Sequence, residues 1–211
     1  MHIRITCNQR PGSGIMFNPE VDKRGAPKIT DRPDREIAQE KLFRQDGRYG
    51  FPIKMLWGAL IAAGRFVKNG KSLLTTAERT LVPSIIQRIE DSFIFFLEHS
   101  DWEVNVDFTY NKNRERLRTV RPRFEKWSFV ATLEVSDDAQ PEVVLALCQI
   151  AGSKVGLGSF SISHRGTCGA FEVVKFEVIK VTDNEIDTKK VQIEFVDSFE
   201  RSKLKSAVAR S

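Results

Sequence analysis

The stretch VGLGSFSISHRGTCGAFEVVKFEV, residues 155–178, joins a glycine-rich turn to a strand-like segment and decides how the fold is interpreted. Its four glycines form two pairs, Gly156/Gly158 and Gly166/Gly169. Glycine adopts backbone conformations and permits close approaches that other residues do not. The pairs therefore predict a bent loop that brings main-chain amides close either to a phosphate or to another strand. The segment FEVVKFEVI that follows is predicted to be a strand.

Elements on either side of this loop alternate between helix and strand. PEVVLALCQIAGS (141–153) is predicted to be a helix, with Pro141 in its first turn and Gly152 near its end. An earlier helix begins at Pro52 and has apolar residues at helical spacing. Alternating polar and apolar residues predict strands at 2–7, 103–110, 128–135 and 191–196. The resulting order predicts an α+β fold with a ferredoxin-like (RRM-like) βαββαβ core.

We expect one domain over residues 1–211, elaborated by a long first loop and an inserted β-rich arm. The additions are a Pro- and Gly-rich loop at 8–34, an insertion with a basic arm at 72–127 and a tail at 197–211. A helix is predicted over DREIAQEKLFRQ (34–45), capped by Asp31 or Asp34 and closed by Gly47. Residues 72–101 fit either a helix or two short strands, and a strand is favoured for FIFFLE (93–98).

Composition excludes some classes of protein. No apolar run of eighteen residues exists, so the sequence predicts neither a membrane span nor a membrane partner. The N-terminus has no apolar signal region. Three scattered cysteines do not make a disulfide framework and are typical of a reducing cytoplasm.

Positive charge is concentrated between Lys112 and Lys126. This segment has seven basic and two acidic residues, an excess of 7 − 2 = +5 that equals the formal net charge of the chain. Arginine suits phosphate oxygens because its planar guanidinium offers several donors at once. Phe124 and Trp127 stand beside these cations, and Trp127 either stacks on a base or caps the core. The predicted phosphate contacts here are Arg116, Arg118, Arg121, Arg123 and Lys126.

Two segments resemble the repeat-associated mysterious protein (RAMP) superfamily, the RNA-binding subunits of CRISPR effector complexes. FPIKMLWGALIAAGRF (51–66) resembles the family helix I-P-x-S-S-L-K-G-A-L-R, with its proline at Pro52, its Gly-Ala-Leu at 58–60 and a shifted arginine at Arg65. The Ser-Ser-Leu-Lys part is replaced, and its lysine is displaced to Lys54.

Residues 155–173 resemble the family glycine loop G-x-G-x-x-R-x-x-G-x-G-R-V-x-V. Here Ala170 or Phe171 replaces the closing arginine of that loop. The resemblance implies that a modified RRM-like domain holds single-stranded RNA or DNA against a helix N-terminus, this loop and the basic arm. Beyond the basic run, the resemblance implies that nucleic acid is bound by Lys54, Gly156, Gly158, His164, Arg165, Gly166 and Gly169.

The resemblance also has implications for assembly. The layout looks like that of CRISPR effector backbone subunits, and like solitary members of the family encoded by phages or prophages. Such a protein is expected to be one protomer of a filament, partnered by copies of itself or by related RAMP-like subunits, in a prokaryotic or phage-infected cell.

Two alternatives to simple binding are considered. Some relatives cleave RNA with a histidine-centred, metal-independent site, but His2, His99 and His164 have no evident general-base partner. The backbone subunits of the type III CRISPR complexes use an aspartate in their first long loop. In this sequence that aspartate would correspond to Asp22, Asp31 or Asp34. The other alternative is a phage structural protein or CRISPR-interfering decoy that acts by protein contacts, which an exposed apolar hairpin at 72–101 would favour. We expect a non-enzymatic protein.

No metal or cofactor is expected. His164, Cys168 and Cys148 invite a zinc interpretation, but the paired C-x-x-C spacing of zinc sites is absent.

Overall fold

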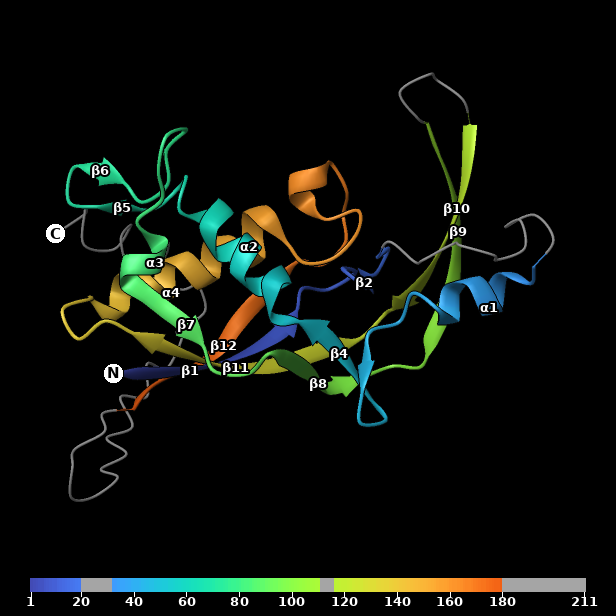
Figure 1. The fold of residues 1–211 in the computed structure, drawn as a ribbon, viewed down its shortest axis with the longest axis horizontal. Coiled ribbons are helices and arrows are strands. Elements are labelled where there is room, and N and C mark those ends of the chain that lie inside the picture. Colours follow the sequence, from blue (N-terminus) through green and yellow to red (C-terminus); the bar gives the residue numbers. More distant parts are fainter. Residues whose placement is uncertain (20–31, 111–115, 180–211) are drawn as a thin grey trace, which may run out of the picture.

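The computed structural model describes residues 1–19, 32–110 and 116–179, and these form an antiparallel sheet covered by helices on one face (Figure 1). The strand order of the main sheet is β12-β1-β11-β8-β4-β3, and β7 also pairs with β11. The expected α+β architecture is therefore present. The strands are β1 (His2–Gln9), β3 (Arg44–Gln45), β4 (Arg48–Pro52), β7 (Ile86–Ile89), β8 (Phe93–His99), β11 (Trp127–Val135) and β12 (Phe171–Ile179).

The covering helices are α2 (Ile53–Ala63), the short α3 (Val82–Ile85) and α4 (Pro141–Ile150). The predicted helices at 52 and 141 are thus observed. A π-helical turn, Ala151–Val155, continues α4 and leads into the glycine-rich segment. A small two-stranded sheet, β5 (Lys68–Asn69) with β6 (Ser72–Leu73), follows α2. In the described part of the chain, none of the helices is long and apolar enough to cross a membrane.

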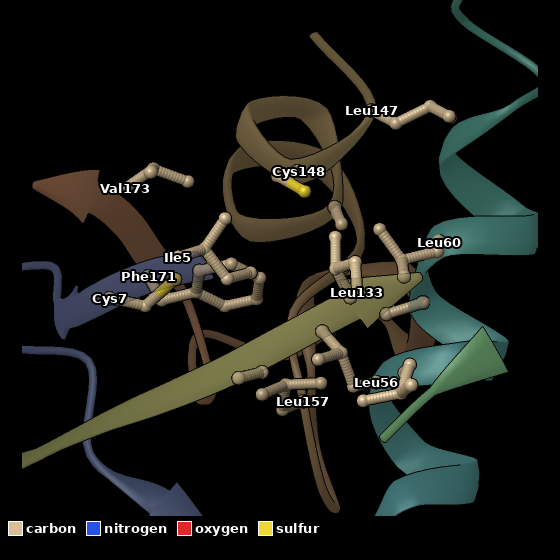
Figure 2. Close-up of a cluster of buried hydrophobic side chains, with 14 of the residues drawn as sticks. Ile5, Cys7, Leu56, Leu60, Leu133, Leu147, Cys148, Leu157, Phe171 and Val173 are labelled. Atoms are coloured by element: carbon tan, nitrogen blue, oxygen red, sulfur yellow. The ribbon is translucent and has the colours of Figure 1, made fainter. Parts of the chain in front are cut away.

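Alternation in the central strands builds the core between the sheet and the helices. Ile5 and Cys7 of β1 point to the helical side, where they meet residues of the neighbouring strands and of both long helices (Figure 2). Burial raises the pKa of the Cys148 thiol to about 12, so this group stays protonated at neutral pH. The other side chains labelled there are Leu56, Leu60, Leu133, Leu147, Leu157, Phe171 and Val173.

The predicted helix 34–45 is wrong in its second half. The helix α1 spans only Asp34–Gln39, and β3 and β4 form a hairpin from residue 44 onward. Asp46 and Gly47 turn this hairpin with φ angles of 50° and 77°, and Asp-Gly is a common hairpin turn. No side chain caps α1 at its start. The cause of the early stop is packing, because the Phe43 ring lies against Phe17 at 5.1 Å between centroids.

A second sheet forms the arm, which we define as the hairpin of β9 (Trp102–Tyr110) and β10 (Arg116–Phe124). It projects away from the helical layer (Figure 1). The strand β2 (Ile15–Met16) pairs with the base of β10 and completes this sheet in the order β2-β10-β9. The helix α1 packs on the arm through Ile37, Ala38 and Val120.

Residues 72–101 form two strands in their second half, as favoured from the sequence for 93–98. β7 and β8 pair with β11 and bury Ile86, Ile89, Ile94 and Phe96. This part of the predicted insertion 72–127 therefore belongs to the main sheet, and 72–101 is not an exposed apolar hairpin. Within this stretch Leu73 and Leu97 are exposed, and the arm has three further exposed apolar side chains, at Val106, Phe108 and Leu117.

Gly58, in the middle of α2, offers a test of helix stability. A Cβ built at this glycine meets nothing within 4 Å, so Gly58→Ala adds helix propensity without a clash. We expect a gain of about 1 kcal/mol in the free energy of unfolding, measured by urea denaturation. Gly64→Ala, at the end of the same helix, is the control. Its Cβ would lie 2.4 Å from Thr75 Oγ1, so a loss of stability is expected there.

Candidate nucleic-acid interface

The glycine loop, residues 156–170, is held mainly by its own backbone. Gly156 N–H donates to Ala151 O at 2.8 Å, and Gly166 N–H donates to Ser161 O at 2.9 Å. Leu157 N–H donates to Gly169 O at 2.9 Å. The amides of Gly156 and Gly166 thus serve the protein's own carbonyls and do not form an open anion-binding nest.

Glycine is required in this loop for close approach. A Cβ at Gly166 would lie 1.7 Å from Phe160 O, and one at Gly169 would lie 1.8 Å from Leu157 O. At Gly158 the nearest atom would be Met16 O, at 2.4 Å. Of the two alternatives left open by the sequence, close approach to another strand describes Gly158, whereas Gly166 and Gly169 make room for backbone atoms of the glycine loop itself.

The strand approached is β2, which joins the glycine loop to the arm. Ser159 N–H donates to Met16 O at 2.7 Å, and Gly169 N–H donates to Gly14 O at 2.9 Å. Met16 is in turn the register partner of Arg123 in β10. We call this contact, residues 13–17 with the loop on one side and β10 on the other, the loop–arm junction.

Ser13 ties the junction to the main sheet. Its hydroxyl donates to Thr167 O at 2.9 Å and accepts from Ala170 N–H at 2.8 Å. Its carbonyl accepts from Trp127 Nε1–H at 2.9 Å. Sequence reasoning missed Ser13 and β2, because two residues of strand within a long loop leave no periodic signal.

Arg121 and Arg123 of β10 lie close to Cys168 in the glycine loop. Burial raises the pKa of its thiol, while the positive charges of Arg123 and Arg121 oppose this effect. Because charge interactions weaken with distance, the side chains must be close neighbours. The charge of Glu125 acts on the same thiol in the opposite direction, so the base of the arm brings charges of both signs close to the glycine loop.

Three of the predicted arginines are engaged by the protein itself. Arg118 forms an ion pair with Asp34 of α1, and this hydrogen bond raises the pKa of the Arg118 guanidinium. Arg123 Nε lies 2.8 Å from Glu125 Oε1. The Arg116 guanidinium lies 3.7 Å above the centre of the Phe108 ring, a cation–π contact that leaves its charge exposed.

Arg121 differs from the other arginines because it is 4% exposed. Its Nε and Nη1 atoms are shielded from solvent and have no hydrogen-bond partner within the described ranges. A phosphate does not reach these two atoms in this conformation. Sequence reasoning missed this burial, because all the arginines of the run look alike before the strand is placed in its sheet.

The remaining predicted cations lie on the surface. Lys126 follows β10, Arg165 lies in the glycine loop with φ of 60°, and Lys54 lies in the first turn of α2. His164 is exposed, and its Nδ1 lies 3.0 Å from Ser161 Oγ and 3.2 Å from Ser163 Oγ. These hydroxyls fix the orientation of the imidazole.

The aromatic residues beside the basic run do not face a ligand. Phe124 is fully buried, and Trp127 is buried beside Phe129 at 6.0 Å between ring centroids. The expectation that Trp127 either stacks on a base or caps the core is therefore resolved in favour of the core. Burial explains the outcome, because the indole N–H already has a carbonyl partner.

Some sequence expectations fall outside the described ranges. These are the strand at 191–196, the tail 197–211, and the residues Asp22, Asp31, Lys112 and Arg114. Among the residues that the structure describes, no three His, Cys, Asp or Glu side chains gather as a metal site would require.

Comparison with known proteins shows a likeness in fold. No protein-family model matches the sequence, and no curated protein matches it. A chain in the cryo-EM structure of the Type III-B Cmr-beta bound to cognate target RNA is similar, with a TM-score of 0.51 and 15% identity. The match covers 85% of this chain and 60% of that one, so the present chain spans about three fifths of its length. This likeness concerns the fold alone.

Proposed function

We propose that this protein binds single-stranded nucleic acid, RNA in preference to DNA, through phosphate contacts along the glycine loop and the arm. The observation that carries the proposal is the loop–arm junction, in which Met16 contacts both Ser159 and Arg123. The exposed Arg165 belongs to the loop, and the exposed Lys126 follows β10 by two residues. A strand that follows this surface meets positive charge from both, which favours its phosphates.

We interpret the core as ferredoxin-like. The order of the elements along the chain is β1, α2, β7–β8, β11, α4, β12, and β1 lies between β11 and β12 in the sheet. A βαββαβ core has this arrangement, with its last strand beside its first. RRM modules of this kind bind single strands, which supports a binding function.

The proposed context is that of a RAMP-like subunit of a CRISPR effector or a related assembly. Support comes from the likeness to the Cmr-beta chain, which was determined with cognate target RNA bound, and from the motif resemblance in α2 and in the glycine loop. We propose that the protein assembles with copies of itself or with related subunits, and that it is of the solitary, phage-associated kind.

The salt dependence of binding tests this function. The measurement is fluorescence anisotropy of a labelled twenty-nucleotide RNA, and of a DNA of the same sequence, at 50 to 200 mM NaCl. With about five phosphate contacts, single-strand affinity falls about a hundredfold over this range. We expect this fall for both, with tighter binding of RNA. Absence of binding at 50 mM, or an affinity that salt does not change, would contradict the proposal.

We propose that binding is not accompanied by cleavage, although His164 is well oriented. Its imidazole contacts two hydroxyls, but a general acid/base reaction needs a group positioned on the substrate side as well. End-labelled hairpin RNA incubated without metal is expected to stay intact with both wild type and His164→Ala. Cleavage by the wild type that disappears in His164→Ala would instead establish the endoribonuclease alternative.

A further inference from the structure

Phe160 is an exposed aromatic residue in the glycine loop that neither the motifs nor the charge pattern singled out. Its side chain is 42% exposed, and its φ of 57° lies in the left-handed region. This conformation is costly for a residue with a Cβ, and such strain persists where the surroundings impose it. This conformation therefore lowers the stability of the loop while it keeps an apolar ring exposed to solvent.

The backbone around Phe160 leaves it little freedom. Its carbonyl accepts from Cys168 N–H at 3.1 Å, and the absent side chain of Gly166 makes room for that carbonyl. The preceding Ser159 N–H is bonded to β2. No other aromatic ring contacts Phe160 within the described residues. The ring is thus partly exposed on a backbone that hydrogen bonds hold in place.

The neighbours of Phe160 indicate the chemistry of its ligand. Arg165, also left-handed with φ of 60°, and His164 present polar, exposed groups in the same loop. Of the intervening residues, Ser161 is buried, Ile162 is half-buried and Ser163 presents an exposed hydroxyl. An exposed ring beside an arginine, an imidazole and a hydroxyl suits an unstacked base with its phosphate, whereas a protein partner favours a continuous apolar patch.

We propose that Phe160 is a stacking platform for one nucleobase of the bound strand, with Arg165 contacting the adjacent phosphate. This inference rests on the proposed function and adds a fixed base position to it. Stacking is tolerant of sequence because every base has a π face. The platform therefore sets where the strand lies without selecting its bases.

The test compares Phe160→Ala, Phe160→Trp and the control Phe66→Ala. Phe66 is 52% exposed, but its ring is already covered by Lys154 Nζ at 4.7 Å from its centre. By anisotropy with the labelled RNA, Phe160→Ala is expected to bind about tenfold more weakly. Phe160→Trp is expected to retain wild-type affinity, and so is Phe66→Ala. Equal affinity of Phe160→Ala and wild type, or equal losses in both alanine variants, would overturn the inference.

A second measurement separates stacking from a structural effect. Phe160→Gly relieves the left-handed strain, so its melting temperature is expected to equal or exceed that of the wild type while its RNA affinity falls. Because binding without base selection puts some base on the ring in every register, an RNA with 2-aminopurine at several positions is expected to change its fluorescence on binding to wild type and to change it much less on saturation with Phe160→Gly. Equal changes with the two proteins refute the platform alone, whereas absence of wild-type binding refutes the proposed function.

Discussion

Reversing the charge of Arg116, Lys126 and Arg165 together is expected to weaken RNA binding about a hundredfold and to leave the fold intact. All three side chains are exposed, and none has a carboxylate partner within the described ranges. Each lost phosphate contact removes about 0.7 from the salt slope for a single strand, so the slope is expected to fall by about two. Anisotropy titrations at several salt concentrations measure both quantities.

The matched control places the same change at the other end of the molecule. Lys68, Lys71 and Arg79 are exposed and lie in or near the β5–β6 hairpin, which Figure 1 shows far from the arm. Either triple replacement by Glu changes the formal charge by six, from +5 to −1. Binding by the control variant is expected to stay within a fewfold of wild type. Equal losses in the two triples would show that overall charge, and not the loop–arm surface, attracts the strand.

Gly169→Ala is expected to lower the free energy of unfolding by about 3 kcal/mol. The residue has φ of 71°, and an added Cβ would lie 1.8 Å from Leu157 O and 2.6 Å from Leu157 N. Backbone atoms cannot move aside without breaking the Gly169 hydrogen bonds to Gly14 and Leu157. Urea denaturation followed by circular dichroism measures the loss. RNA affinity is expected to fall as well, because the loop would leave the junction.

Gly12→Ala separates the two causes of the stability loss expected for Gly169→Ala, which are the left-handed backbone angle and the close contact with Leu157. Gly12 has nearly the same backbone angle, φ of 75°, but an added Cβ meets nothing within 4 Å. Only the left-handed strain applies there, at about 1 kcal/mol. If the two variants were equally destabilised, close approach would contribute nothing and the description of Gly169 as tightly packed against Leu157 would be wrong.

Sequence periodicity predicted the elements that have one buried face. The strands around Ile5, Leu133 and Phe176 and the helices from Pro52 and Pro141 are all present. In each of these elements, the spacing of the apolar residues indicates which face packs against the core.

Elements defined by contacts between distant residues were not predicted. The predicted helix 34–45 wrongly included β3 and the residues before it, although the Asp-Gly turn signal was present at 46–47. β2 has no local signal, since its two residues become a strand only through pairing with β10. The separation of buried Arg121 from exposed Arg116 likewise depends on the tertiary position of each along one strand.

The bond from the Ser13 hydroxyl to Thr167 O spans 154 positions of the chain. Contacts between residues so far apart in sequence form late in folding. Closing a long chain segment costs conformational entropy, which is offset only when the surrounding native contacts have formed. The surface proposed to hold RNA is therefore complete only on a chain that has been synthesised at least as far as residues 167–170.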